Sequence, residues 1–309
     1  QVSTPNVTTQ RNNTYTNPVP VAAPGIGNGL VENCADPSTF YAEDGYWYTY
    51  CTRDPLNGDD RNEAGELNFR NIPILRSADL TNWTYVGEAL DELPEWADPD
   101  TTVFAPEIQF RNGAYYLYYI VTSASAGVSG SPNCSSDQAI GVATAKSAAG
   151  PWTDSGKVVV EPKYNGPSRP FGSRDCNFFG AIDPEVVTAG AQRYMYFGGY
   201  YGGIFARPLS ADGFSTDKNR TTRITIDNRY EGAEVVRKDG YYYLFVSATN
   251  CCNGPLTGYS VFVGRSRGPL GPYRDREGVS LLEPRVGGSV VLSMNGNRWV
   301  GTGHNTVLQ

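Results

Sequence analysis

A sequence unit that recurs four times constrains the fold of this chain more than any other feature. Each copy has a short motif, an apolar run, a glycine turn and a strand rich in aromatic residues. The copies start at Ala35-Asp36-Pro37, Ala105-Pro106-Glu107, Ile182-Asp183-Pro184 and Glu231-Gly232-Ala233. A second strand pair follows three of the hairpins, so each unit has about four strands. Radially stacked four-stranded units predict a β-propeller, in which the innermost strand of each blade begins at a central channel.

A fifth anchor, Gly303-His304-Asn305-Thr306-Val307, lies near the end of the sequence, and barely one strand follows it before Gln309. Four units therefore run from about 31 to 302, and a fifth begins at His304. An open edge in the ring would expose unpaired backbone groups. We therefore expect a C-terminal segment or a second chain to complete the last blade, unless the N-terminal arm fills the gap.

The composition also favours β structure. Of the 309 residues, 12% are aromatic and only 18% are charged, which suits pleated, half-buried surfaces. No helical period is longer than two turns. Residues 1–30 are rich in Pro, Asn, Thr and Val without any period, which predicts an extended N-terminal arm. Residues 31–309 are expected to form one catalytic propeller domain.

Charge and histidine content exclude several functions. The net charge is -7 and there is no run of Lys or Arg, which argues against nucleic acid or an anionic membrane as the partner. No stretch approaches 18 consecutive apolar residues, so no membrane span is expected. The single histidine excludes a His-rich metal centre and leaves His304 as the only candidate base for a Ser-His-Asp triad. A neutral ligand is the expectation.

Two features favour secretion. The sequence contains five Asn-X-Ser/Thr sequons, at Asn6, Asn12, Asn82, Asn133 and Asn219. It also contains six cysteines without a Cys-x-x-Cys pair, which suits disulfides better than zinc. We expect Cys34 to pair with Cys51 and Cys134 with Cys176, leaving Cys251 and Cys252 as a vicinal disulfide or as two buried thiols. Because the sequence starts at Gln1 without a signal peptide, we expect a mature, processed, extracellular chain.

Three carboxylates suggest the chemistry. Asp36, Asp183 and Glu231 occupy equivalent points of different units, so a propeller would bring them to one axis. Carboxyls around a channel mouth are the equipment of glycoside hydrolysis, in which one protonates the leaving oxygen and another activates water. A third carboxylate can hold the acid protonated and oriented. The alternative is that the Asp-Pro pairs are ordinary turn formers.

The ordered motifs resemble glycoside hydrolase family 43, and within it the arabinan-degrading branch, over residues 31–309. The motifs are Ala35-Asp36-Pro37-Ser38, Phe104-Ala105-Pro106-Glu107, Ala181-Ile182-Asp183-Pro184, Gly202-Gly203-Ile204, Glu231-Gly232-Ala233, Tyr242-Tyr243-Leu244-Phe245-Val246-Ser247, Cys251-Cys252 and Gly301-Thr302-Gly303-His304-Asn305. The resemblance implies a five-bladed β-propeller, with the fifth blade incomplete in this chain, and inversion at the anomeric carbon. It implies Asp36 as general base, Asp183 as the carboxylate that tunes the acid, and Glu231 as general acid.

The resemblance also implies that His304 lies on the propeller axis beside a calcium or other ion; no organic cofactor is expected. The family's arabinanases carry Trp where Phe104 and Tyr201 stand here, and a proline where Ala233 stands. Phe104, Phe178 and Tyr201 are candidate sugar-binding aromatics.

Two further glutamates have open roles. Glu107 is expected either to hydrogen-bond substrate or to cap a strand. Glu234 is a rival acid, but strand alternation places it on the face opposite Glu231, which predicts a structural role.

The leading hypothesis is a secreted inverting hydrolase of α-L-arabinofuranosyl linkages in plant cell-wall arabinan or another arabinose-containing polysaccharide. The alternatives are a β-xylosidase or galactan hydrolase on the same scaffold, and a non-catalytic sugar-binding propeller, which would lack one of the acids. Loops 53–70 and 126–137 are expected to decide between endo and exo cleavage.

Overall fold

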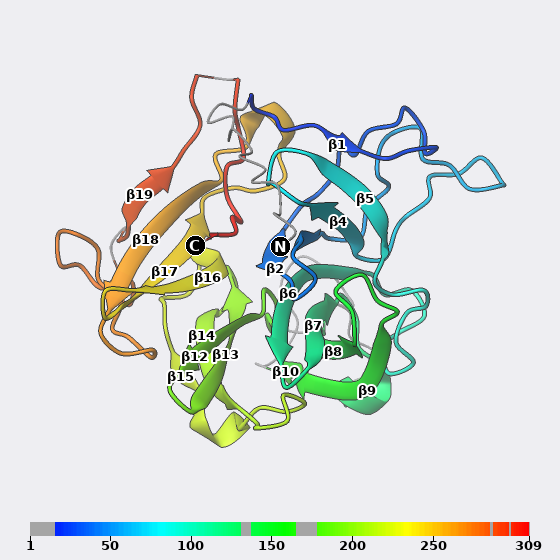
Figure 1. Cartoon of the computed structure of the whole chain (residues 1–309). Helices are drawn as coiled ribbons and strands as arrows, with labels where there is room; N and C mark the ends of the chain where they lie inside the picture. The colour runs from blue at the N-terminus through cyan, green and yellow to red at the C-terminus, as the bar shows by residue number, and fades with distance from the viewer. Residues whose placement is uncertain (1–15, 131–136, 165–177, 285–286, 297, 309) are drawn as a thin grey trace, which may run out of the picture.

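Four sheets surround a common centre in the computed structural model of the chain (Figure 1). The structure describes residues 16–130, 137–164, 178–284, 287–296 and 298–308. Each sheet is a blade of four consecutive antiparallel strands, and the first strand of each blade lies innermost. The predicted all-β propeller built from units of about four strands is therefore confirmed.

Blades 1 and 2 form the N-terminal half of the ring. Blade 1 contains β2 (Ser38–Tyr41), β3 (Trp47–Tyr50), β4 (Pro73–Ser77) and β5 (Trp83–Glu88), and β1 (Val21–Ala22) joins its outer edge parallel to β5. Blade 2 contains β6 (Val103–Arg111), β7 (Ala114–Val121), β8 (Ala139–Ala145) and β9 (Thr153–Val160). A short helix, α1 (Ala126–Ser129), lies between β7 and β8.

Blades 3 and 4 complete the described ring. Blade 3 contains β12 (Glu185–Ala189), β13 (Gln192–Gly199), β14 (Gly203–Leu209) and β15 (Thr222–Arg223). Blade 4 contains β16 (Tyr230–Lys238), β17 (Tyr241–Ala248), β18 (Ser260–Ser266) and β19 (Ser289–Leu292). A separate two-stranded sheet joins β10 (Lys163–Tyr164) to β11 (Phe178–Phe179). Two 3-10 turns, η1 (Lys218–Arg220) and η2 (Gly254–Leu256), lie in loops.

The hydrophobic core lies between the blades. One cluster joins residues of blades 1 and 2, a second joins blades 2 and 3, and a third joins blades 3 and 4. Most of the largest fully buried side chains are tyrosines, among them Tyr50, Tyr118 and Tyr196. The aromatic strands of the repeat therefore supply the packing that joins neighbouring blades, because broad half-buried rings fill the space between two pleated surfaces.

The prediction of a fifth blade is wrong: the described residues form four blades. No strand is assigned after β19 among residues 293–296 and 298–308. His304 does enter the centre of the ring, but the main-chain N–H groups of His304 and Val307 donate to the side chains of Ser247 and Glu234. The segment is therefore fixed by side-chain acceptors, and no strand ladder forms there. Within residues 16–30, the described part of the N-terminal arm, β1 is the one strand, and it pairs with β5 at the outer edge of blade 1.

The cysteine predictions have mixed outcomes. The expected Cys34–Cys51 disulfide is confirmed. Cys134 and Cys176 lie outside the described residues. Cys251 and Cys252 are free and exposed, so they are neither the vicinal disulfide nor the buried thiols that we expected.

Two further predictions concern the surface. Asn82 and Asn219 of the predicted sequons are exposed, whereas Asn6, Asn12 and Asn133 lie outside the described residues. In the described part of the chain, no helix has the length and apolarity needed to cross a membrane.

Candidate active site

Five residues share an unusual backbone conformation where the chain enters the centre of the ring. Their φ angles are positive: Asp36 49°, Ala105 42°, Asp183 51°, Gly232 59° and His304 53°. Residues with a Cβ rarely adopt this left-handed conformation, which concentrates at functional sites. The structural equivalent of Asp36 and Asp183 in blade 4 is therefore Gly232, and Glu231 precedes the shared position by one residue.

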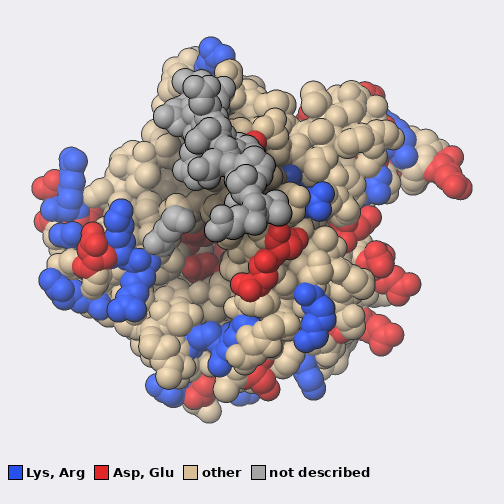
Figure 2. Space-filling view, viewed as in Figure 1, with Lys and Arg blue, Asp and Glu red and all other residues tan. Residues whose placement is uncertain are grey.

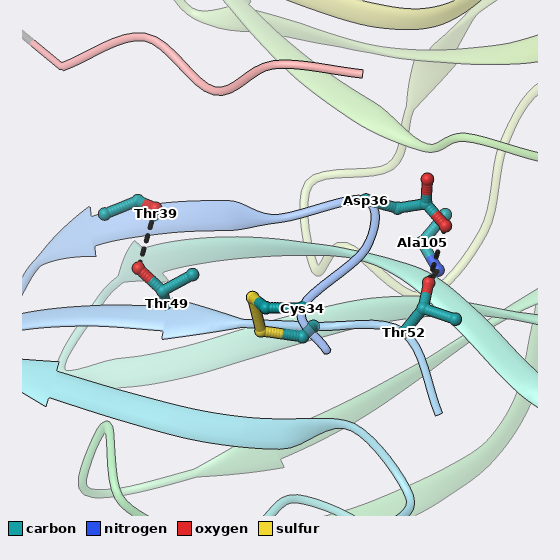
Figure 3. The surroundings of a disulfide bond; sticks show 7 residues. Cys34, Asp36, Thr39, Thr49, Thr52 and Ala105 are labelled. Carbon is teal, nitrogen blue, oxygen red and sulfur yellow. Dashed lines mark hydrogen bonds between the residues drawn. A yellow bond between two sulfur atoms is a disulfide. The ribbon is translucent and has the colours of Figure 1, made fainter. Parts of the chain in front are cut away.

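Asp36 is held between blade 1 and the C-terminal segment. Its Oδ2 accepts a hydrogen bond from the Thr52 hydroxyl at 2.7 Å, and its Oδ1 lies 2.9 Å from Nδ1 of His304. The N–H of Ala105 donates to the same Thr52 hydroxyl, so this side chain links blade 1 to blade 2 (Figure 3). Burial raises the pKa of Asp36, but the His304 charge and the bonds from His304 and Thr52 outweigh it, so the pKa lies below its ordinary value. Asp36 is therefore an ionised carboxylate at neutral pH.

Asp183 has a different environment. Its carboxyl is buried, and its Oδ2 accepts a hydrogen bond of 2.8 Å from the N–H of Gly232 in the next blade. Burial raises its pKa to about 7; the carboxylates of Asp36 and Glu231 act in the same direction, while His304 opposes them. Two acids at equivalent positions therefore have pKa values shifted in opposite directions, which is the usual sign of divided roles in acid-base chemistry.

Glu231 lies on β16, near Tyr259 and Cys251. The Tyr259 hydroxyl is within hydrogen-bonding reach of Glu231, and the pKa of this tyrosine is raised by burial and by the carboxylates of Glu231 and Asp183. Desolvation, contact with Cys252 and the nearby carboxylates of Glu231 and Asp36 raise the pKa of Cys251 to about 12. The cysteine pair therefore lies close to the acids.

The charges of all three carboxyls act on the imidazole of His304. Burial lowers its pKa, but Asp36, Asp183 and Glu231 together raise it to about 9, so the imidazole is protonated at neutral pH. The side chains predicted to converge from different units are therefore gathered at the centre. In the space-filling view this centre is hollowed and acidic side chains are visible within it (Figure 2).

The predicted substrate-contacting residues lie in different surroundings. Phe104 is partly buried against the core between blades 2 and 3, whereas Tyr201 is 56% exposed and lies edge-on to Tyr200. Phe178 pairs with Tyr164 in the small sheet. Glu107 is buried and accepts bonds from Ser38, Gln109 and Val186, so its surroundings disfavour direct contact with sugar. The substrate contacts of all four residues stay predictions.

No role was predicted for Thr52, Tyr259 or Ser247, although Ser247 ends one of the motifs that carry the family resemblance. None belongs to an anchor motif: Thr52 follows β3, Tyr259 precedes β18, and Ser247 lies on β17 opposite Glu231. Strand register could have predicted these three residues. In an antiparallel pair, the end of the second strand of a blade lies beside the start of the first strand. The register also shifts between Glu231 and Glu234, and a bulge changes which face a side chain occupies. The prediction that Glu234 lies on the face opposite Glu231 is therefore wrong, whereas its predicted structural role stays a prediction. Burial raises the pKa of the Glu234 carboxyl to about 8, and the charges of Glu107 and His304 also act on it.

Comparison with known proteins decides the family. The model of glycosyl hydrolases family 43 matches residues 30–309. This chain is a member of glycosyl hydrolase family 43. It is therefore a glycoside hydrolase, and the resemblance predicted from the motifs is confirmed.

Two curated relatives and one solved structure each align with most of this chain. It is 30% identical to the extracellular endo-α-(1→5)-L-arabinanase 1 of Bacillus subtilis over 304 residues, covering 94% of this chain and 81% of the relative. It is 31% identical to an extracellular exo-α-(1→5)-L-arabinofuranosidase of Cellvibrio japonicus over 76% of this chain and 68% of the relative. The solved α-L-arabinanase of Cellvibrio cellulosa in complex with arabinohexaose matches with a TM-score of 0.68 and 29% identity, covering 89% of this chain and 82% of that one.

Proposed function

We propose that this family 43 member is a secreted inverting hydrolase of α-L-arabinofuranosyl linkages, acting on plant cell-wall arabinan or another arabinose-containing polysaccharide. The observation that carries the proposal is the meeting of Asp36, Asp183 and Glu231 around His304 at the centre of the ring. The substrate class is supported by relatives named as arabinanases and by the arabinohexaose complex of one of them.

In the proposed mechanism Asp36 is the general base. A carboxylate kept ionised by His304 and Thr52 accepts a proton from the water that attacks the anomeric carbon. Glu231 is the general acid that protonates the leaving glycosidic oxygen. The pKa of Asp183 is about 7, and the carboxylates of Asp36 and Glu231 both act on it. Asp183 also holds the main chain next to Glu231, because it accepts a hydrogen bond from the N–H of Gly232. Its role is to orient and tune the acid.

Extracellular action is supported by three observations. The relatives from Bacillus subtilis and Cellvibrio japonicus are named extracellular. A disulfide joins Cys34 to Cys51, and such bonds persist in oxidising compartments. Two of the predicted glycosylation sequons are exposed.

The axial ion implied by the family resemblance stays a prediction. Nδ1 of His304 is taken by Asp36, and the ring is protonated at neutral pH, so its other nitrogen offers a cation no lone pair until it loses its proton. Within the described ranges, no group of three or more His, Cys, Asp or Glu side chains is arranged to hold a metal. The described side chains therefore form no metal site by themselves, and no step of the mechanism uses an ion.

The proposal is tested on linear α-(1→5)-arabinan and on paired nitrophenyl glycosides. We expect release of arabinose or arabino-oligosaccharides, and cleavage of the α-L-arabinofuranoside but not the β-D-xyloside. Xylose release alone would refute the arabinan assignment in favour of a β-xylosidase. The length distribution of the products separates endo from exo cleavage.

A substitution of the acid tests the assignment of Glu231. Glu231→Gln keeps the shape of the side chain but cannot donate the proton, so kcat is expected to fall by roughly 10²–10⁴-fold while oligosaccharide binding is retained. Glu283→Gln, at an exposed glutamate of the outer loop, is the matched control and should leave kcat unchanged. Unchanged turnover in Glu231→Gln would show that another group is the acid.

A further inference from the structure

A second set of side chains lies two residues beyond the left-handed anchors. Ser38 follows Asp36, Glu107 follows Ala105, Glu185 follows Asp183, and Glu234 follows Gly232. We call Ser38, Glu107, Glu185 and Glu234 the inner ring. All four lie on the innermost strands of their blades, β2, β6, β12 and β16.

Each member of the inner ring makes the same kind of contact. Each member accepts a hydrogen bond from the main-chain N–H of a residue on the next inner segment around the ring, one position beyond the corresponding site. The links are Ile108 N to Ser38 Oγ at 3.2 Å, Val186 N to Glu107 Oε1 at 3.4 Å, Val235 N to Glu185 Oε1 at 3.0 Å and Val307 N to Glu234 Oε1 at 2.9 Å. The four bonds run in one direction from blade 1 to the C-terminal segment.

These bonds explain why carboxyls are buried at the centre. The innermost strand of a blade has a free edge, and its N–H groups need acceptors when they are removed from water. Burying a carboxyl is costly unless hydrogen bonds compensate for the loss of water. Here each inner-ring carboxyl satisfies an N–H of the next segment, and Ser38 Oγ also donates to Glu107 at 2.9 Å.

The last link fixes the segment that carries His304. Several contacts hold this segment, which forms no strand within its described residues. Val307 donates to Glu234, the N–H of His304 donates to Ser247 Oγ at 2.7 Å, and Gly303 lies against the Tyr259 ring so closely that a Cβ there would collide with it. The segment runs between blade 4 and blade 1 toward the centre (Figure 1). These contacts bring the His304 imidazole to the catalytic side of blade 1, where it meets Asp36.

We propose that the inner-ring glutamates are positioning residues, and that Glu234, through Val307, seats His304 against Asp36. In this role they act by setting where the inner segments lie relative to one another, and not by taking part in the proton transfers. The kinetic part of the proposal rests on the proposed function, whereas the structural part does not. His304 is the only histidine in the sequence, so the NMR signal of a labelled imidazole reports the position of this ring alone.

The test removes either end of the last link. Val307→Pro deletes the N–H donor, and Glu234→Met deletes the carboxyl acceptors at similar side-chain length. Glu234→Gln keeps the amide oxygen as an acceptor and is the conservative rescue. Leu308→Pro, which places a proline at the neighbouring exposed residue, is the matched control. Each variant is examined by ¹H–¹³C NMR of ring-labelled histidine, by its melting temperature, and by kcat and KM on linear arabinan.

We expect the imidazole shift to move in Val307→Pro and Glu234→Met, with kcat at least tenfold lower and KM changed less than about threefold, since positioning mainly affects the chemical step. Glu234→Gln and Leu308→Pro should keep the wild-type shift and kcat within about threefold. If Val307→Pro does not fold, Glu234→Met decides.

Two results would overturn the proposal. One is an unmoved imidazole shift and unchanged kcat in the folded deletion variants. The other is a loss in Glu234→Gln as large as that in Glu234→Met, because the acceptor would then be irrelevant. If wild-type protein fails to cleave arabinan, the proposed function fails, but the imidazole measurement still tests the seat.

Discussion

Replacing Cys34 and Cys51 by alanine tests how the covalent frame of the site contributes to stability and turnover. The disulfide closes a loop between residues 17 apart in sequence. Loop-closure entropy for this length corresponds to about 3 kcal/mol of stabilisation at 25 °C. Unfolding a chain of this length has an entropy of about 0.6 kcal/mol/K, so the melting temperature is expected to fall by about 5 °C.

The same bond lies next to the proposed base. Cys34 precedes Asp36 by two residues, and Cys51 is adjacent to Thr52, whose hydroxyl donates to Asp36 (Figure 3). Loosening both should therefore lower kcat more than it raises KM. Differential scanning calorimetry and initial rates on arabinan measure the two effects.

The matched control is the double variant Cys251→Ser and Cys252→Ser, because both thiols are free and exposed. Its melting temperature should stay within about 1 °C of wild type, since exposed substitutions usually change stability by less than about 0.5 kcal/mol. A fall of less than 1 °C in the Cys34 and Cys51 variant would refute the reasoning, as would an equal fall in the control.

Two further predictions concern buried acid-base groups. Burial raises the pKa of Glu107 to about 7 and of Glu234 to about 8; it also raises that of Glu185, and repulsion from Glu107 and Glu234 adds to this. The folded state therefore keeps protons that the unfolded state releases above about pH 4.5, and His304, whose pKa is raised to about 9, keeps its proton longer than an unfolded histidine does. Urea stability should therefore fall as pH rises from about 4.5 to about 9; a stability that rises across this window contradicts the assignment. Tyr259→Phe removes the hydroxyl beside Glu231 and should lower kcat roughly tenfold with little change in melting temperature; unchanged kcat would show that the hydroxyl is idle.

The repeat pattern predicted the propeller because each blade is specified locally. Glycine turns, aromatic strands and anchor motifs lie close together in sequence, so the four-stranded units could be recognised. The blade count failed at His304. Its backbone conformation matches the other anchors, but whether a strand forms depends on a partner ladder, and that information is not in the motif.

The acids were predictable for a similar reason, since Asp36 and Asp183 stand in short recurring motifs. Their partners were not predictable. Thr52 and Tyr259 reach the site through strand register, and the bulge after Glu231 changed the face that Glu234 occupies. The inner ring depends on side chains meeting the main chain of neighbouring blades, and such contacts need the three-dimensional arrangement.

The most direct test of the central claim is the anomeric form of the first product. Fresh enzyme is mixed with linear α-(1→5)-arabinan in an NMR tube, and the new reducing end is followed by ¹H NMR before mutarotation. A base at Asp36 that activates water opposite the leaving group predicts the β-anomer first, by inversion. Initial appearance of the α-anomer would contradict the assigned roles of Asp36 and Glu231.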